Sequence, residues 1–236
     1  MQSIDTPFVA VLKSAYKNHS TLPDRCSISL GIDVNQNDYS DVVEIVAIHG
    51  GLDDLLSRLA DSHPTDRSHL DEFDRQFWTV MNEAAAFAWA VEQGFTGVSF
   101  TDDNATTDVT VLDGPMIEAK TVDVSPEERA IKSRMAEASD RGEIVSRITG
   151  HMRSPHPNLL KKFEDGLQDA LEKLARQKGG ELIVYFELAG GDWPISRRQA
   201  FEQIEVWASD ATRRTGARIV VWKSDQWRNP FLDTAR

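Results

Sequence analysis

The sequence predicts an α/β protein with a mixed central sheet flanked by helices, preceded by a mostly helical N-terminal extension. A long apolar stripe with a period of about 3.6 residues runs from Leu70 to Gln93 and predicts an amphipathic helix. Two short strand patterns joined by the turn residues Asp113-Gly114-Pro115 follow it and predict a hairpin. Beyond the hairpin, helical patterns alternate with two apolar strands, which completes the α/β pattern.

Length and composition favour one main domain with an accessory region. The chain has 236 residues, of which 40% are hydrophobic, enough for one sizeable core or for a core plus an accessory segment. We assign residues 1–69 to the accessory region and residues 70–236 to the main domain. In the accessory region, apolar residues at helical spacing occupy Phe8–Tyr16 and Val42–Ala60, the second around a Gly50-Gly51 break.

The first elements of the main domain are bounded by turn residues. Gly94 ends the long helix, and the polar residues after Phe100 separate two strands. The expected strands are Phe95–Phe100, Asp108–Leu112 and Met116–Val122.

The later elements alternate between helix and strand. Ser125-Pro126-Glu127-Glu128 is a typical helix start, because serine caps the helix and proline suits its first position. Leu182–Leu188 is almost continuously apolar, as in strands covered on both faces. The expected order is a helix from Ser125 to Thr149, a helix from Pro157 to Lys178, the strand Leu182–Leu188, a helix from Ser196 to Thr215 and the strand Ala217–Trp222.

The net charge of −12 argues against a general polyanion binder, because phosphate contacts require Lys and Arg. The charge is uneven, since residues 151–236 hold 14 Lys and Arg against 12 Asp and Glu, whereas residues 1–150 hold 12 against 26. Two interpretations stay open for the basic residues of the second part: a basic strip or solvated helix surfaces. They are Lys161, Lys162, Arg197, Arg198, Arg213, Arg214 and Arg218.

The single cysteine, Cys26, cannot form an internal disulfide and lies in no cluster with zinc-ligand spacing. No basic flank precedes an apolar stretch at the N-terminus, and no apolar run approaches the roughly 20 residues of a membrane span. We therefore expect a cytoplasmic protein without a membrane partner. The sequence also has no Walker phosphate loop and no Gly-x-Ser-x-Gly elbow, so an ATPase or a serine hydrolase finds no support.

An acid and a base are paired in Glu118-Ala119-Lys120, ten residues after Asp108. Side chains alternate faces along a strand, so Glu118 and Lys120 should share one face of the sheet. A three-residue loop, Asp113-Gly114-Pro115, would pair Leu112 with Met116 and set Asp108 across from Lys120 on that face. A two-residue loop would move Asp108 to the opposite face. Pro115 cannot donate to a strand ladder, which favours the longer loop.

Over roughly residues 70–224, this order of elements and the trio Asp108, Glu118 and Lys120 resemble the PD-(D/E)xK nuclease superfamily. The resemblance implies a restriction-endonuclease-like αβββαβ core, here with one extra helix. Thr107 stands where the family name has proline. Nucleases of this type often take a further glutamate from the first helix, about three turns before its final glycine. Glu83 matches that position better than Glu92, which lies in the last turn.

The resemblance implies an Mg²⁺- or Mn²⁺-dependent endonuclease, a hydrolase that cuts phosphodiester bonds in DNA rather than RNA. Asp108, Glu118, the Ala119 carbonyl and Glu83 would hold the metal ion, which prefers oxygen ligands. Lys120 would orient or deprotonate the attacking water and stabilise the developing charge. Many relatives act as dimers, so a homodimer is expected as one arrangement.

A different class of function stays open. The nuclease-like domain would then be an inactive interaction module in a larger assembly, with the acidic residues 1–69 contacting a basic protein. Several other residues are interpreted as ordinary loop, turn or packing residues, with a catalytic or base-stacking role as the alternative. They are His49, Asp102, Asp103, Asp113, His151, His156, Trp193 and Trp227.

Overall fold

The computed structural model describes residues 38–61, 70–101, 107–122, 141, 157–177, 180–186, 197–222 and 231–233. Several sequence predictions lie outside these residues: the helices Phe8–Tyr16 and Ser125–Thr149, and the residues Cys26, Asp102, Asp103, His151, His156, Trp193 and Trp227. None of the helices in the described ranges has the length and apolar character of a membrane span.

The described helices match the periodic patterns of the sequence closely. The two helices before residue 62 are separated at Gly50-Gly51, as predicted, and the long helix ends just before Gly94. The helices are α3 (Asp38–Ile48), α4 (Leu52–Asp61), α5 (Leu70–Glu92), α7 (Pro157–Arg176) and α8 (Arg197–Thr215).

The strands form one six-stranded mixed sheet in the order β1-β2-β3-β4-β5-β6. Strands β1, β2 and β3 pair antiparallel, β3, β4 and β5 pair parallel, and β6 pairs antiparallel with β5. The α/β class with a mixed, helix-flanked sheet is therefore confirmed. The strands are β1 (Val98–Phe100), β2 (Val109–Val111), β3 (Met116–Val122), β4 (Gly180–Phe186), β5 (Arg218–Trp222) and β6 (Phe231–Asp233).

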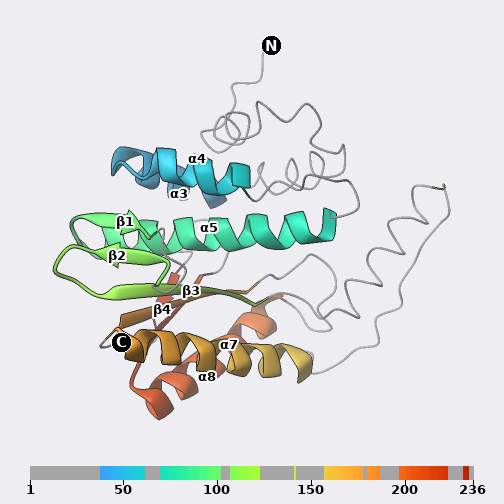
Figure 1. Ribbon diagram of the computed structural model, residues 1–236. Coiled ribbons are helices and arrows are strands. Elements are labelled where there is room, and N and C mark those ends of the chain that lie inside the picture. The colour runs from blue at the N-terminus through green and yellow to red at the C-terminus, as the bar shows by residue number, and fades with distance from the viewer. Residues whose placement is uncertain are drawn as a thin grey trace.

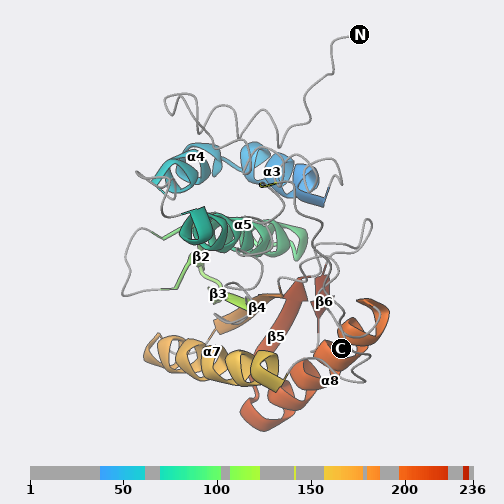
Figure 2. The same cartoon turned by 90° about the vertical axis from the view of Figure 1, so that its right-hand side faces the viewer.

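The helices lie in layers on the two faces of the sheet. Figures 1 and 2 show α5 along one face, α7 and α8 along the other, and α3 and α4 stacked on the outer side of α5. Helix α5 is therefore enclosed between the sheet and a second helical layer. Every residue from Met81 to Ala90 is buried, as expected for a helix covered on both sides.

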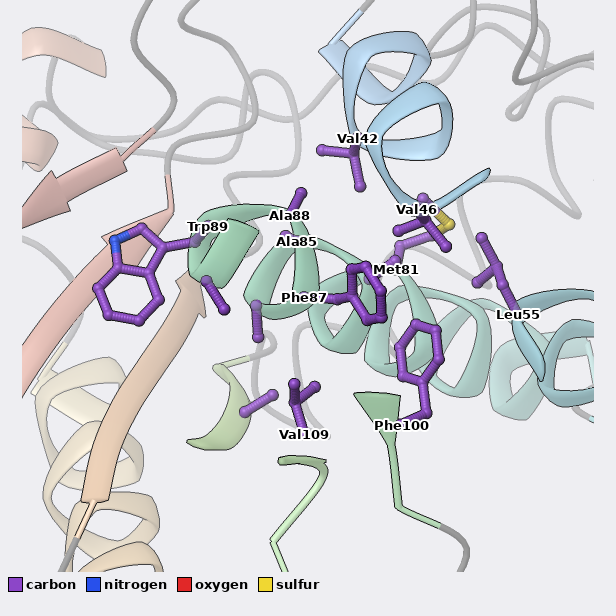
Figure 3. Packing of buried hydrophobic residues seen from close by; sticks show 14 of the residues in the cluster. Val42, Val46, Leu55, Met81, Ala85, Phe87, Ala88, Trp89, Phe100 and Val109 are labelled. Atoms are coloured by element: carbon purple, nitrogen blue, oxygen red, sulfur yellow. The ribbon is translucent and has the colours of Figure 1, made fainter. Parts of the chain in front are cut away.

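The core around α5 joins the N-terminal helices to the sheet (Figure 3). The rings of Phe87 and Phe100 stack at 5.0 Å between centroids, while Val42, Val46 and Leu55 belong to the same cluster from α3 and α4. Residues 38–61 thus share one core with the long helix. The division of the chain at residue 69 stays a prediction.

A second core lies under α7 and α8, and β3 takes part in both cores. Ile117 and Ala119 are buried in the α5 core, whereas Met116 and Val122 pack in the core of α7 and α8. Because alternate residues of a strand face opposite sides, Glu118 and Lys120 project toward α7. The prediction of one apolar and one charged face for this strand fits this arrangement.

The hairpin register differs from the predicted pairing of Leu112 with Met116. Val109 pairs with Ile117, a shift of two residues that sets Asp108 across from Glu118 instead of Lys120. The turn closes earlier because the Gly114 N–H donates to the Val111 carbonyl at 3.1 Å. Asp113 adopts a positive φ of 55°, which aspartate tolerates in turns. An even shift keeps every side chain on its face, so Asp108 still lies on the face of Glu118.

Candidate functional site

Glu118 is a buried carboxylate at the centre of a charged cluster. It is 1% exposed, and Lys120 Nζ of the same strand lies 3.0 Å from its Oε1. Lys173 of α7 reaches the same carboxylate from the helix layer, with Nζ 3.1 Å from Oε1 and 2.8 Å from Oε2. Two ammonium groups therefore offset the cost of burying one negative charge.

Asp108 lies immediately before β2 and bridges toward β3. Its Oδ2 accepts a hydrogen bond of 2.8 Å from the Ala119 amide, and its Oδ1 lies 3.8 Å from Lys173 Nζ. Burial, followed by the negative charge of Glu118, raises the pKa of Asp108 to about 6 despite the Ala119 hydrogen bond and the nearby lysines. Asp108 and Glu118 thus face one common ammonium group.

Glu83 projects from α5 and is 8% exposed. Arg58 Nη1 of α4 lies 2.6 Å from its Oε2. Burial and then the charge of Asp108 raise the pKa of Glu83 to about 7, and the Arg58 guanidinium only partly opposes this rise. The charge of Glu118 also contributes to the shift, which shows that the three carboxylates are electrostatic neighbours.

Glu92, the other candidate on this helix, lies elsewhere. It is exposed at the end of α5. Its pKa is raised first by partial burial and second by the negative charge of Asp41 on α3. Of the two glutamates, Glu83 is therefore the one near Asp108 and Glu118, and its role as a metal ligand stays a prediction.

Arg58 ties the N-terminal helices to the site. Besides Glu83, it donates to the Thr101 carbonyl at the end of β1 and lies over the Phe100 ring, 5.1 Å from the centroid. Leu55 and Leu59 anchor its helix in the core, which directs the intervening Arg58 toward the sheet.

Lys173 occupies the last turn of α7 next to the buried Leu174. One turn further on, the Gln177 side chain accepts a hydrogen bond of 3.3 Å from the Thr107 hydroxyl, which holds the start of β2 against this helix end. Partial burial disfavours the charged form of Lys173, but its hydrogen bond to Glu118 and the charge of Asp108 outweigh burial and raise its pKa.

The structure brings Asp108, Glu118 and Lys120 together around Lys173. Glu83 lies close enough for the charges of Asp108 and Glu118 to raise its pKa. Sequence reasoning missed Lys173 and Arg58. Lys173 is 55 residues from Glu118 and Arg58 is 25 residues from Glu83, so no local spacing links either pair. The only sequence signal for both cations was a basic residue beside a core position of an amphipathic helix.

The donors of the cluster suit a hard divalent cation, although they are not arranged as a metal site. Within the described ranges, no group of three or more His, Cys, Asp and Glu side chains is placed to hold a metal ion. The chemistry of the donors fits, because Asp108, Glu118 and Glu83 all offer oxygen. Glu118 Oε2 is buried and lies 2.8 Å from Lys173 Nζ without hydrogen-bond geometry, so a metal ion at this oxygen would meet the Lys173 ammonium.

The backbone at Ala119 adds one further oxygen. Its N–H points toward β2, where it meets Asp108. The N–H and the carbonyl of one strand residue point to the same edge of the strand, so the Ala119 carbonyl also faces that side.

Three of the basic residues near the end of the chain, Arg213, Arg214 and Arg218, have local partners. Arg213 Nη2 lies 3.1 Å from Asp210 Oδ1, and Arg214 Nη2 lies 2.8 Å from Glu164 Oε1. The guanidinium carbon of Arg218 lies 4.9 Å from the centroid of the Trp89 ring. Local pairing therefore explains these arginines. Lys161 is exposed near the start of α7, and His49 is exposed in the turn between α3 and α4, as a turn residue should be.

Comparison with family models, with curated proteins and with solved structures found no match. The chemistry of the cluster is therefore inferred from its own residues. Three carboxylates, Glu83, Asp108 and Glu118, face three cations, Arg58, Lys120 and Lys173. The formal charges balance, so an added divalent cation would leave this part of the acidic chain positive.

Proposed function

We propose that this chain is a metal-dependent nuclease of the PD-(D/E)xK type, with a restriction-endonuclease-like core, that hydrolyses phosphodiester bonds in DNA rather than RNA. One observation carries the proposal: Asp108, Glu118 and Lys120 lie together where β2 meets β3, with the glutamate and the lysine on one face of the strand. The order of the described elements, a long helix, three antiparallel strands, then helix and strand twice, supports it as well.

The chain's own residues can divide the work of such a reaction. A bound Mg²⁺ or Mn²⁺ would supply a Lewis acid and a water of lowered pKa. Asp108, Glu118, the Ala119 carbonyl and Glu83 would hold it, because all four donors are oxygens. Lys120 has its ammonium 3.0 Å from Glu118 and would orient the attacking water or stabilise charge on the phosphorane.

The local charges favour a phosphodiester substrate in spite of the chain's net charge of −12. Arg58, Lys120 and Lys173 neutralise the three carboxylates, so the two charges of a bound divalent cation remain to attract a phosphate. Electrostatic attraction over a few ångströms depends on the nearest charges, since salt screens the more distant exposed ones within about 10 Å.

The test is cleavage of single-stranded and double-stranded DNA and of RNA with Mg²⁺, with Mn²⁺ and with EDTA. We expect metal-dependent cleavage of DNA, reduced about 100-fold or more by Glu118→Gln and by Lys120→Met, because a charged group in contact with the reacting atoms is lost. Glu44→Gln on α3 and Lys161→Met on α7 alter exposed residues and should leave the rate unchanged. Equal rates in all four folded variants would refute the assignment.

One observation favours the second candidate, an inactive nuclease-like interaction module. Lys173 pairs with Asp108 and Glu118, and no group of three metal-ligating side chains is preassembled in the described ranges. Wild-type protein that neither binds Mn²⁺ nor cleaves any of these substrates would favour this candidate. A basic protein partner of the acidic N-terminal region would then be sought.

A further inference from the structure

Among the residues that the structure describes, Lys173 is the cation that contacts both Glu118 and Asp108. Its Nζ lies 2.8 Å and 3.1 Å from the two Glu118 oxygens and 3.8 Å from Asp108 Oδ1. Lys120, by comparison, forms its ion pair with Oε1 of Glu118. The ammonium of Lys173 therefore faces both oxygens of the Glu118 carboxylate, which a single cation can share.

A metal ion and this ammonium require the same lone pairs. Mg²⁺ binds carboxylate oxygens at about 2.0–2.1 Å, and it approaches along the lone-pair directions that an N–H donor also uses. Glu118 is 1% exposed, so little water screens the repulsion between the Lys173 ammonium and a divalent ion at the same carboxylate. Occupation by one cation thus excludes the other.

We propose that Lys173 is a competing counterion of the metal ligands: it must leave Glu118 and Asp108 when a divalent cation is held there, and it then binds a phosphate oxygen of the substrate. The inference rests on the proposed nuclease function and adds to it a residue that sequence reasoning did not identify.

The position of Lys173 allows this exchange. It lies in the last turn of α7, and its side chain is 23% exposed, so the side chain is partly in contact with solvent. The four-carbon stem of lysine carries a flexible, strongly hydrated point charge that can move by several ångströms without a shift of the helix. The buried neighbour Leu174 holds the backbone in place during such a movement.

The experiment measures Mn²⁺ binding and DNA binding separately on the full chain at pH 8. Free Mn²⁺ is followed by electron paramagnetic resonance for the wild type, Lys173→Met and the matched control Lys161→Met, an exposed lysine of the same helix. We expect Lys173→Met to bind Mn²⁺ about tenfold more tightly, equivalent to about 1.4 kcal/mol, because a competing cation has been removed. Lys161→Met should equal the wild type.

The second measurement is the affinity for a short DNA duplex with Ca²⁺ in place of Mn²⁺, by fluorescence anisotropy. Lys173→Met should bind the duplex severalfold more weakly, because a phosphate contact is lost. A merely structural lysine would not strengthen metal binding and weaken DNA binding in the same variant. If Lys173→Met fails to fold, as judged by its circular dichroism spectrum, Lys173→Gln removes the charge and keeps a polar group.

The outcomes separate this inference from the function on which it rests. Wild-type protein that binds no Mn²⁺ would overturn the proposed nuclease and the inference together. Wild-type protein that binds Mn²⁺ and cleaves DNA, with an unchanged Mn²⁺ or DNA affinity in the folded Lys173 variants, would overturn only the role of Lys173.

Discussion

Replacing Glu83 by glutamine should flatten the pH dependence of stability in the metal-free protein. The pKa of this carboxyl is raised from 4.5 to about 7, chiefly by burial. The folded state therefore binds a proton more tightly than the unfolded state does. Stability from this group is fully present below pH 4.5 and is lost as the pH rises through about 7.

The size of the effect follows from the shift. A change of one pKa unit corresponds to about 1.4 kcal/mol, so the shift of Glu83 corresponds to about 3 kcal/mol. We expect the wild type to lose about 3 kcal/mol relative to Glu83→Gln between pH 4.5 and pH 8. The glutamine side chain of this variant would keep an oxygen that accepts the Arg58 hydrogen bond, which limits other changes.

The assay is urea unfolding followed by circular dichroism, in EDTA, at a series of pH values for both proteins. The difference in unfolding free energy between them cancels the titrating groups that do not interact with Glu83, and its change with pH reports Glu83 together with its neighbour Asp108. The control Glu44→Gln replaces an exposed glutamate of α3, and its difference from the wild type should stay near zero throughout. A difference for Glu83→Gln that does not change between pH 4.5 and pH 8 would refute the assigned burial and charge environment.

Two further predictions concern the fold. A Cβ on Gly180 would clash with the Met116 carbonyl oxygen, so Gly180→Ala should lower the unfolding free energy by about 2 kcal/mol or more. A Cβ on Gly166 in α7 would meet no other atom, so Gly166→Ala should raise the unfolding free energy by about 1 kcal/mol. Equal urea midpoints for the two variants would contradict the β3–β4 packing. A chain that begins at Leu70 should fail to fold, because it lacks five buried aliphatic residues of the α5 core that together contribute about 10 kcal/mol. A cooperative urea transition of that chain would disprove the estimate. These five residues are Val42, Val43, Val46, Leu55 and Leu59.

Local sequence patterns were sufficient for much of the fold. The bounds of β3, Met116–Val122, are those predicted, and α5 ends one residue from its predicted end. The helix is long and strongly periodic, and the turn residues Asp113-Gly114-Pro115 mark the start of the strand. The edge strand β6 has only three residues and no alternation, so the pattern around Phe231–Asp233 did not indicate it.

The candidate site was predictable only as far as its residues are neighbours along one hairpin. The face shared by Glu118 and Lys120 follows from the two-residue period of a strand. The register depended on how Asp113 and Gly114 close the turn, a choice that a positive φ at one residue decides. Lys173 and Arg58 reach the site through helix packing, which depends on the whole core, and no local spacing links them to Glu118 and Glu83.

The hydrogen bond from the Ala119 amide to Asp108 makes that amide a built-in spectroscopic reporter of the site. In a regular ladder this proton would meet a backbone carbonyl, whose charge never changes. Here its partner is a carboxylate with a pKa of about 6, so protonation or cation binding at Asp108 should move one backbone amide resonance in the middle of β3. The state of the carboxylate can therefore be followed without a substrate and without a label attached to the site.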